Sequence, residues 1–468
     1  MGKQAFEIPK MKVVPELDPD FIPAEKASSA FETAVKASGR SAPLAIALER
    51  GPISVSVFKT AVFANPSEEE FKASLRYVER LLKGMLWMKG GRKVTIAGDA
   101  RICAELAKIY SNNGARAFDA KIMARIYSGP MEFISKPFDE NAPHEIASAQ
   151  PLGRHLEGCR IGFDLGGSDR KVAAMIDGKV VFSEEIPWDP YFQKDPSWHK
   201  AGINDSLRSA AAKLPRVDAI GGSAAGVYVE NRVRIASLFR GVPEEQFESS
   251  VRDLFLDLGR EWGVPFVVVN DGEVTALAGS MEMNANCVLG ISMGTSMAGG
   301  CVDAEGRITD WLNELAFAPI DYRSDAPADE WSGDLGCGVQ YFSQQGAARL
   351  AAKAGIELPA DMPLAKRLIE IQELLKAGDK RAIKVFETIG VCFGYSVAWY
   401  ARFYEIEKLL ILGRVTSGAG GDIVIAKAKE VLQAEYPQLA KFIEFRIPDE
   451  QGRRHGQAIA AASLPSIK

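Results

Sequence analysis

A short glycine-containing segment follows the apolar stretch 159–163 and has the residue types of a phosphate-binding turn. Its residues are Asp164, Leu165, Gly166, Gly167 and Ser168. Two glycines in a turn between strands leave backbone N–H groups uncovered, so phosphate oxygens can approach them closely. The Ser168 hydroxyl would add a donor, and the Asp164 carboxylate could hold Mg²⁺ through a water molecule. An ordinary tight hairpin would use the same residue types, so this segment alone leaves both interpretations open.

Glycine and hydroxyl side chains also follow a second apolar stretch, at residues 287–291. The residues concerned are Gly294, Thr295 and Ser296. Both segments come after the first strand of a repeated pattern of elements, and two turns in equivalent positions are harder to explain by chance than one. We expect the second segment to bind the β- and γ-phosphates of a nucleoside triphosphate.

An acidic residue stands where a third apolar stretch, 265–269, gives way to a helical pattern. The sequence there is Asn270-Asp271-Gly272-Glu273. A carboxylate at the carboxyl end of a buried strand lies where ligands collect in α/β sheets. Asp271 could accept the proton of a hydroxyl group as its oxygen attacks a phosphorus atom, because the rest of phosphoryl transfer is positioning and charge neutralisation. Capping the helix is the alternative role for this residue.

A further glycine-rich stretch, 413–421, separates the apolar residues 409–412 from a helical pattern. Glycines between a strand and a helix allow a flat ring to lie against the backbone. We expect Gly413, Ser417 and Gly418 to contact an adenosine, with a flexible turn as the alternative.

The elements that must position these segments form a repeat. In the first copy, predicted strands cover 160–164, 171–176, 179–183, 217–220 and 265–269, with helices at 244–262 and after Asp271. In the second copy, predicted strands cover 287–291, 297–302, 409–412 and 442–447, with helices at 422–434 and from His455. Strands that alternate with helices predict an α/β fold. Two such copies would form two lobes around a cleft, with both glycine turns pointing into it.

We expect three domains. The first lobe would cover residues 155–283 and the second lobe 284–468, with a C-terminal helix near 454–463 that packs back at the lobe junction. Residues 1–150 would form an additional N-terminal α/β domain of unknown role, in which the proline-containing residues 1–40 are loosely structured.

Within the N-terminal domain, the pattern predicts alternating strands and helices. The predicted strands are 43–48, 53–63, 93–97 and 115–119, and the predicted helices are 68–88 and 100–110. Ser67 and Glu70 have the spacing of a capping box at the start of the first helix. Residues 137–151 would link this domain to the repeat.

The composition is that of a globular protein, with 468 residues, 47% of them hydrophobic and 25% charged. The formal charge of -5 gives no electrostatic reason to expect nucleic-acid binding. No apolar run approaches the roughly 18–20 residues that span a bilayer, and the first residues lack the pattern of a secretory signal. We therefore expect a cytoplasmic protein that binds neither nucleic acid nor membrane.

The cysteines and histidines show no metal-binding pattern. The six cysteines are Cys103, Cys159, Cys287, Cys301, Cys337 and Cys392, and no two of them form a CxxC pair. The four histidines also lack ligand spacing. This predicts free thiols in a reducing compartment and no structural zinc.

The order of these motifs resembles that of the ROK group of bacterial sugar kinases and repressors, within the hexokinase and actin-like superfamily. The resemblance covers about residues 159–468 through four short motifs: Asp-x-Gly-Gly-[Ser/Thr], Asn-Asp, Gly-Thr and Leu-Gly-x-x-x-Ser. It implies a duplicated actin-like (RNase H-like) ATPase fold and phosphorylation of a sugar hydroxyl, with Mg-ATP as the cofactor and Asp271 as the catalytic base. The implied phosphate and nucleoside contacts are Asp164, Gly166, Gly167, Gly294, Thr295, Ser296, Gly413, Ser417 and Gly418.

The sugar-binding motifs match the ROK pattern less closely. Segment 222–226 resembles the loop before the family's sugar contacts, which makes Ser223 a candidate, and Asn270 would be a further contact beside Asp271. Glu314 takes the place of the glutamate in the family's Glu-x-Gly-His, where it would hold sugar hydroxyls.

Phe317 stands where the family has the histidine of that motif. The cysteine-rich zinc segment that normally follows is reduced to residues 336–338. Both departures put the usual hexose preference in doubt, and the substrate could be a hexose or an amino sugar. We expect Phe317 to be a core residue rather than a sugar contact.

Four other classes compete with this interpretation. An ATPase or chaperone-like member of the superfamily is the first, but it would not need a sugar loop beside Asp271. A ROK-like sugar-binding transcription regulator is disfavoured, because residues 53–58 alternate like a strand and the N-terminal domain lacks a basic surface helix. A sugar-binding protein without chemistry is disfavoured by the joint presence of Asp164 and Asp271. A carbohydrate kinase of the same superfamily outside the ROK group is the strongest alternative. Small-molecule sugar and ATP are the expected partners, and the resemblance suggests a homodimer.

Overall fold

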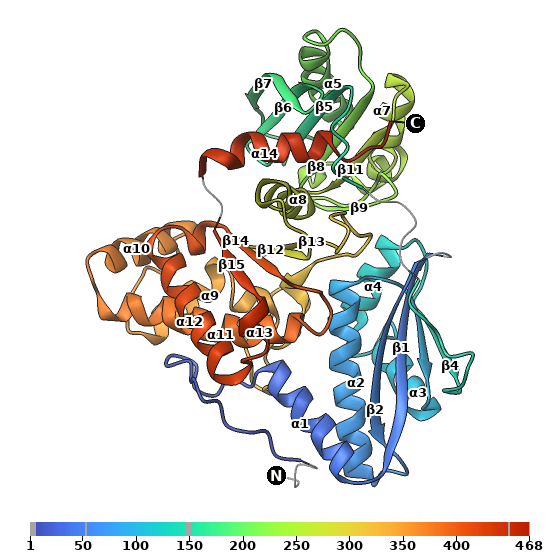
Figure 1. Cartoon of the computed structure of the whole chain (residues 1–468), viewed down its shortest axis with the longest axis vertical. Helices are drawn as coiled ribbons and strands as arrows, with labels where there is room; N and C mark the ends of the chain where they lie inside the picture. Colours follow the sequence, from blue (N-terminus) through green and yellow to red (C-terminus); the bar gives the residue numbers. More distant parts are fainter. Residues whose placement is uncertain (1–5, 52–53, 147–151, 448–449, 468) are drawn as a thin grey trace.

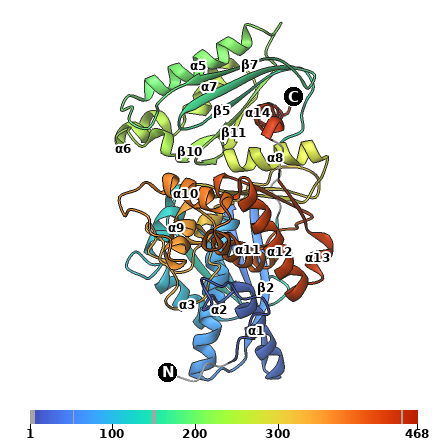
Figure 2. The same ribbon diagram turned by 90° about the vertical axis from the view of Figure 1, so that its left-hand side faces the viewer.

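The computed structural model describes residues 6–51, 54–146, 152–447 and 450–467. The chain folds into an upper and a lower part, each built on one sheet, with the N-terminal segment beside the lower part (Figure 1). Helix α8 (Asp271–Met283) lies between the two parts in both views (Figures 1 and 2). None of the described helices has the length and apolar character needed to cross a membrane.

The upper sheet has five strands in the order β11-β8-β5-β6-β7. Its strands are β5 (Cys159–Leu165), β6 (Asp169–Ile176), β7 (Lys179–Pro187), β8 (Ala219–Ala224) and β11 (Phe266–Asn270). β5 pairs antiparallel with β6 and parallel with β8, and β8 pairs parallel with β11. Asp177 and Gly178 turn the chain between β6 and β7 with φ angles of 47° and 76°, the conformation that an Asp-Gly hairpin favours.

Helices and a small hairpin complete the upper part. They are α5 (Pro196–Ala211), β9 (Val227–Val229), β10 (Arg232–Ile235), α6 (Glu244–Gln246), α7 (Leu254–Trp262) and α14 (Glu450–Ala462). Helix α14 contacts α8, β5 and β8 and so returns the C-terminal end of the chain to the upper sheet (Figure 1). The predicted helix 244–262 is divided by a π-helical turn at Phe247–Val251, which the Arg252 N–H closes by donating to the Phe247 carbonyl at 2.9 Å.

The lower sheet has four strands in the order β13-β12-β14-β15. Its strands are β12 (Val288–Met293), β13 (Met297–Val302), β14 (Lys408–Leu412) and β15 (Glu444–Arg446). β12 pairs antiparallel with β13 and parallel with β14, and β14 pairs parallel with β15. The pairing pattern of β12 thus repeats that of β5. The helices of the lower part are α9 (Gln344–Lys353), α10 (Leu364–Lys376), α11 (Lys380–Tyr400), α12 (Ala419–Glu435) and α13 (Leu439–Phe442).

The N-terminal segment contains a third sheet, with four strands in the order β2-β1-β3-β4. Its elements are α1 (Ala24–Ala37), β1 (Ser41–Gly51), β2 (Ser54–Phe63), α2 (Glu68–Met88), β3 (Lys93–Ala97), α3 (Ala100–Ile109), α4 (Ala117–Ile126) and β4 (Glu132–Lys136). The predicted capping box is present: Ser67 accepts from the Glu70 N–H, and the Glu70 carboxylate accepts from the Ser67 N–H.

Two expectations for this segment are wrong. Residues 24–37 form helix α1 instead of loose structure, because Ala27, Phe31 and Val35 give it a buried face with helical spacing. The predicted strand 115–119 is the start of helix α4, which buries Asp119, Met123 and Ile126 on one side.

One hydrophobic core joins the N-terminal segment to the lower part. Phe31, Leu81 and Ile96 belong to the same cluster of buried side chains as Ile291 and Trp399. The upper part has its own core around Phe163 and Phe255. The expected domain boundaries stay predictions, and the boundary near residue 150 lies outside the described residues.

Candidate active site

The ends of three parallel strands bring polar side chains to one edge of the upper sheet. Asp164 of β5 lies opposite Ser223 of β8, and Asn270 of β11 lies opposite the next residue of β8. The Ser223 hydroxyl donates to Asp164 Oδ1 at 2.7 Å, and both side chains are buried. The Ser223 hydroxyl therefore already donates its hydrogen to Asp164. The expected contact of Ser223 with a sugar stays a prediction.

The first residue of α8 is Asp271, and the residue before it caps the helix. Asn270 Oδ1 accepts from the Gly272 N–H at 2.7 Å, and Asn270 Nδ2 donates to the Gly226 carbonyl at 2.7 Å. The capping role that the sequence left open for Asp271 therefore belongs to Asn270. The Asp271 carboxylate accepts from the Gly272 N–H at 2.9 Å.

Burial and neighbouring charge change the acidity of these carboxyl groups. Burial, together with the charge of Asp164, raises the pKa of Asp271 to about 6. Burial also raises the pKa of Asp164, against the lowering effects of the Ser223 hydrogen bond and of Lys171. Lys171 Nζ lies 3.9 Å from Asp164 Oδ2 and 3.1 Å from Asp169 Oδ1. Sequence analysis missed Lys171, whose position in β6 gave no signal beyond its charge.

The first glycine turn is closed and tightly surrounded. The Gly166 N–H donates to the Asp169 carbonyl at 2.9 Å, and the Gly166 carbonyl accepts from Trp188 Nε1 at 2.8 Å. A Cβ atom at Gly167 would overlap the Tyr191 hydroxyl, so a larger residue there would have to displace the Tyr191 ring. The exposed Ser168 hydroxyl donates to Asp169 at 2.8 Å. Trp188 and Tyr191 come from the loop after β7. Sequence analysis did not predict them, because they belong to no recognisable motif.

The second glycine turn joins β12 and β13 and lies beside the third. The Gly294 N–H donates to the Ser296 carbonyl at 2.9 Å, while Thr295 and Ser296 are exposed. Gly413, with a φ of 99°, packs so closely on Met293 that a Cβ atom would overlap the strand backbone. The structure therefore brings Gly294 and Gly413 together at one end of the lower sheet.

Ser417 and Gly418 follow Gly413 and are both exposed. The Ser417 hydroxyl donates to the Arg414 carbonyl at 2.8 Å and accepts from Gln372 Nε2 at 3.2 Å. These contacts order the turn before α12. The turn remains accessible for a ligand.

Glycines also set the contact between the upper and lower parts. A Cβ atom at Gly300 of β13 would overlap the Gly272 carbonyl, and one at Gly272 would lie 2.5 Å from the Gly299 carbonyl. The N-terminal turn of α8 is thus pressed against the β12–β13 hairpin. Gly294 lies in the turn of this hairpin. The contact therefore places the start of α8, with Asp271, against the same hairpin that carries the second glycine turn.

Two further carboxyl groups lie near Asp271. Burial and the charge of Asp271 raise the pKa of Glu314 to about 7. Burial raises the pKa of Glu273 to about 8, and Asn313 Nδ2 donates to its Oε1 at 3.3 Å. Glu273 stands two residues after Asp271 in the segment 270–273. Its position in the sequence did not predict a role for it.

Phe317 packs against the core, as predicted. Its ring stacks on that of Trp87 with centroids 4.2 Å apart. Cys337, in the reduced zinc segment, is a buried free thiol whose pKa burial raises to about 12. Among the described residues, no three His, Cys, Asp or Glu side chains gather as metal ligands.

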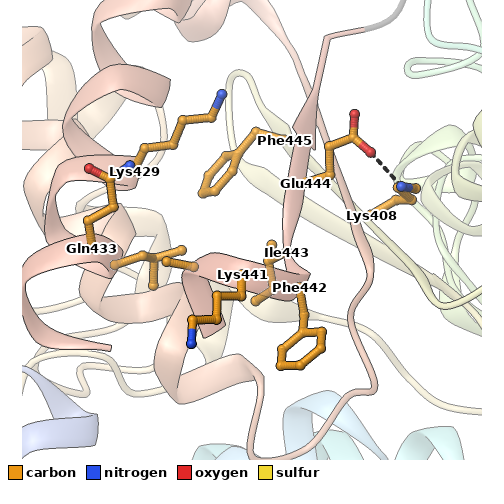
Figure 3. A pocket seen from close by; sticks show the side chains of 10 residues that line it. Lys408, Lys429, Gln433, Lys441, Phe442, Ile443, Glu444 and Phe445 are labelled. Carbon is orange, nitrogen blue, oxygen red and sulfur yellow. Dashed lines mark hydrogen bonds and ion pairs between the residues drawn. The ribbon is translucent and has the colours of Figure 1, made fainter. Parts of the chain in front are cut away.

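A cavity of about 520 Å³ lies away from all these motifs, between α12, α13 and β15. Figure 3 shows its lining, with the Lys408 and Glu444 ion pair on one side and Phe445 on another. None of the predicted site residues lines this cavity.

Many solved structures are similar to this chain, among them a kinase and a regulator. A ROK hexokinase from Thermus thermophilus is 18% identical, with a TM-score of 0.51 over 65% of this chain and 96% of its own. A ROK family transcriptional regulator, a homologue of the E. coli MLC protein, is 18% identical, with a TM-score of 0.50 over 66% of this chain and 79% of its own. No protein-family model and no curated protein matches the sequence. About two thirds of the chain therefore has the fold that ROK-family kinases and regulators share, which confirms the resemblance at the level of fold.

Proposed function

We propose that the protein is an ATP-dependent sugar kinase of the ROK type, with Asp271 as the general base. The observation that carries this proposal is the place of the Asp271 carboxyl, at the start of α8 where that helix packs on β13. Burial there, with the charge of Asp164, raises its pKa to about 6. A base of this kind is ionised near neutral pH and still has useful proton affinity. The fold shared with a ROK hexokinase supports the same class.

In the proposed reaction, a sugar hydroxyl gives its proton to Asp271 while its oxygen forms a bond to the γ-phosphorus of ATP. The bond from this phosphorus to the β–γ bridging oxygen breaks, and ADP leaves with the electron pair. Backbone N–H groups at 167–168 and 295–296, with the Lys171 ammonium, would stabilise the phosphate charge.

Asp164 is the residue that would hold Mg²⁺, through a water molecule. Its Oδ1 accepts from Ser223, and its Oδ2 lies 3.9 Å from Lys171 Nζ, beyond hydrogen-bond distance, so this oxygen could accept from a water ligand. When bound, the ion supplies charge neutralisation for the phosphates. The chain therefore fits the metal that ATP chemistry requires.

We assign the remaining site residues within a duplicated actin-like fold of two lobes around a cleft. Adenosine would lie against Gly413, Ser417 and Gly418. The sugar would contact Asn270 and Glu314 beside the base. With a pKa of about 7, the Glu314 carboxyl group is partly protonated near neutral pH. It can therefore accept a hydrogen bond from one sugar hydroxyl or donate one to another.

A ROK-like sugar-binding regulator is the second candidate function. The structural similarity to a ROK transcriptional regulator is as close as that to the hexokinase and favours neither. The described N-terminal elements form a four-stranded sheet and pack into the core of the lower part. Among these described elements, the packing gives no separate N-terminal domain for binding DNA, so we favour the kinase over the regulator.

The experiment is ADP release from Mg-ATP with a panel of hexoses and amino sugars, for the wild type and for Asp271→Asn. We expect at least one sugar to stimulate turnover. The substitution should lower kcat by about 10²–10⁴-fold, because a general base is lost, and leave ATP binding intact. Turnover that no sugar stimulates would favour the regulator, and a fully active Asp271→Asn variant would remove Asp271 as the base.

A further inference from the structure

The loop that carries Glu314 lies along the C-terminal end of α2, more than 220 residues away in the sequence. The Asn313 N–H donates to the Met88 carbonyl at 3.0 Å, and the Glu314 N–H donates to the Trp87 carbonyl at 2.9 Å. Carbonyl groups in the last turn of a helix have no partner within the helix. The Glu314 loop therefore supplies the hydrogen bonds that the end of α2 needs.

The end of α2 is itself firmly held. The Trp87 ring is buried and stacks on Phe317, with centroids 4.2 Å apart and planes 28° apart. Trp87 Nε1 donates to Asp119 Oδ1 at 2.6 Å, and the same oxygen accepts from Lys83 Nζ at 2.9 Å. Because Trp87 is fixed by α4 on one side and by Phe317 on the other, it can hold the loop in one place.

Asn313 links this platform to the helix of the proposed base. Its Nδ2 donates to Glu273 Oε1 at 3.3 Å, and its Oδ1 accepts from the Tyr404 hydroxyl at 3.1 Å. Glu273 lies in the first turn of α8, two residues after Asp271. Asn313 also has a φ of 54°, a left-handed conformation that asparagine tolerates better than most residues. The residue before Glu314 thus has its backbone, side chain and conformation all constrained.

We propose that the end of α2 and Asn313 together position the Glu314 carboxylate against Asp271, so that the N-terminal segment is a structural part of the sugar site. The inference rests on the proposed sugar kinase function. Trp87 and Asn313 are positioning residues, since neither needs to touch the sugar. Disturbing them should weaken sugar binding selectively, because the phosphate turns have their own supports in Trp188 and Met293.

The first comparison is Trp87→Leu against Tyr77→Leu in the full-length chain. Tyr77 is a matched control, because it lies on the same helix, is equally buried and stacks on Phe31 with centroids also 4.2 Å apart. Trp87→Leu should raise the KM for the sugar by up to about 10²-fold, the size of effect that misplaced groups produce, with the KM for ATP unchanged. Tyr77→Leu should change neither KM. Equal effects of the two substitutions would overturn the proposal.

The second comparison, Asn313→Gly against Asn284→Gly, avoids a large cavity. Asn284 also has a left-handed backbone, with a φ of 48°, at the far end of α8. Glycine keeps this conformation available at both positions and removes the side chain. Asn313→Gly should raise the sugar KM while Asn284→Gly does not. An unchanged sugar KM in Asn313→Gly would contradict the positioning role.

Hydrogen exchange separates this inference from the proposed function. The amides of Asn313 and Glu314 should be protected in the wild type and should exchange faster in Trp87→Leu and Asn313→Gly than in the two controls. If the wild type phosphorylates no sugar, the kinase proposal fails, and this protection still decides whether α2 positions the loop. Protection that persists in both variants would overturn the inference even in an active kinase.

Discussion

The ionisation of the Asp271 carboxyl group should set the pH dependence of turnover. Its pKa of about 6 means that it is protonated in mild acid and ionised above neutrality. Only the ionised form can accept a proton, so kcat/KM should rise with pH through about 6 and then level off. Glu314 titrates nearby, with a pKa of about 7, so the profile should also be measured in Glu314→Gln. If kcat/KM of Glu314→Gln no longer changes near pH 6, the titration belongs to Glu314 and not to Asp271.

Glu273 should affect stability rather than chemistry. Burial raises its pKa from 4.5 to about 8, so the folded chain holds a proton that the unfolded chain has lost. Its stabilising contribution is therefore complete below about pH 4.5 and is lost as the pH rises toward 8, with a limiting slope of about 1.4 kcal/mol per pH unit.

Glu273→Gln stays neutral and can still accept from Asn313, so it removes this proton linkage without removing the hydrogen bond. Its free energy of unfolding, measured by urea titration, should fall less steeply with pH than that of the wild type across about pH 5–8. Identical slopes would show that Glu273 is ionised in the folded protein.

At the scale of elements, the contact of α8 with β13 depends on glycine. Because a Cβ atom at Gly300 would overlap the Gly272 carbonyl, Gly300→Ala should push α8 away from the hairpin. We expect a loss of about 1–3 kcal/mol in the free energy of unfolding, as for an overpacked site, and a lower kcat from the displaced Asp271. Gly51→Ala is the control, since nothing lies within 4 Å of that position. Denaturant unfolding and ADP release measure the two effects, and a variant indistinguishable from Gly51→Ala would contradict this role.

Element boundaries were predictable where local pattern and tertiary packing agree. The predicted helix 68–88 is α2 and the predicted strand 93–97 is β3, because a capping box and a short apolar run mark them. Helix α1 was missed because four prolines precede its apolar face. Residues 115–119 were assigned to a strand because the helical spacing of α4 becomes visible only beyond residue 119.

For the whole molecule, the N-terminal segment and the lower part should unfold as one unit. Phe31 and Leu81 share a continuous core with Ile291 and Trp399, so removing residues 1–150 would expose apolar surface on the remainder. A chain that starts at residue 155 should therefore lose the lower part's share of the thermal transition by circular dichroism, while the upper part keeps its own core, and should bind a hydrophobic dye. A truncated chain that melts cooperatively at the temperature of the full chain would show that the two parts fold independently.

The sequence by itself determined the local units of this protein. An apolar run followed by glycines or an acidic residue defines a strand and its turn, so Asp164, Gly166, Asp271, Gly294 and Gly413 could all be named as candidates. Only the tertiary structure decided what surrounds them. Lys171 beside Asp164, and the hydrogen bonds from Asn313 to Met88 and to Glu273, join strands and helices that are distant in the chain. A pKa depends on burial and on charges brought close by folding, and neither quantity is written in the spacing of residues along the sequence.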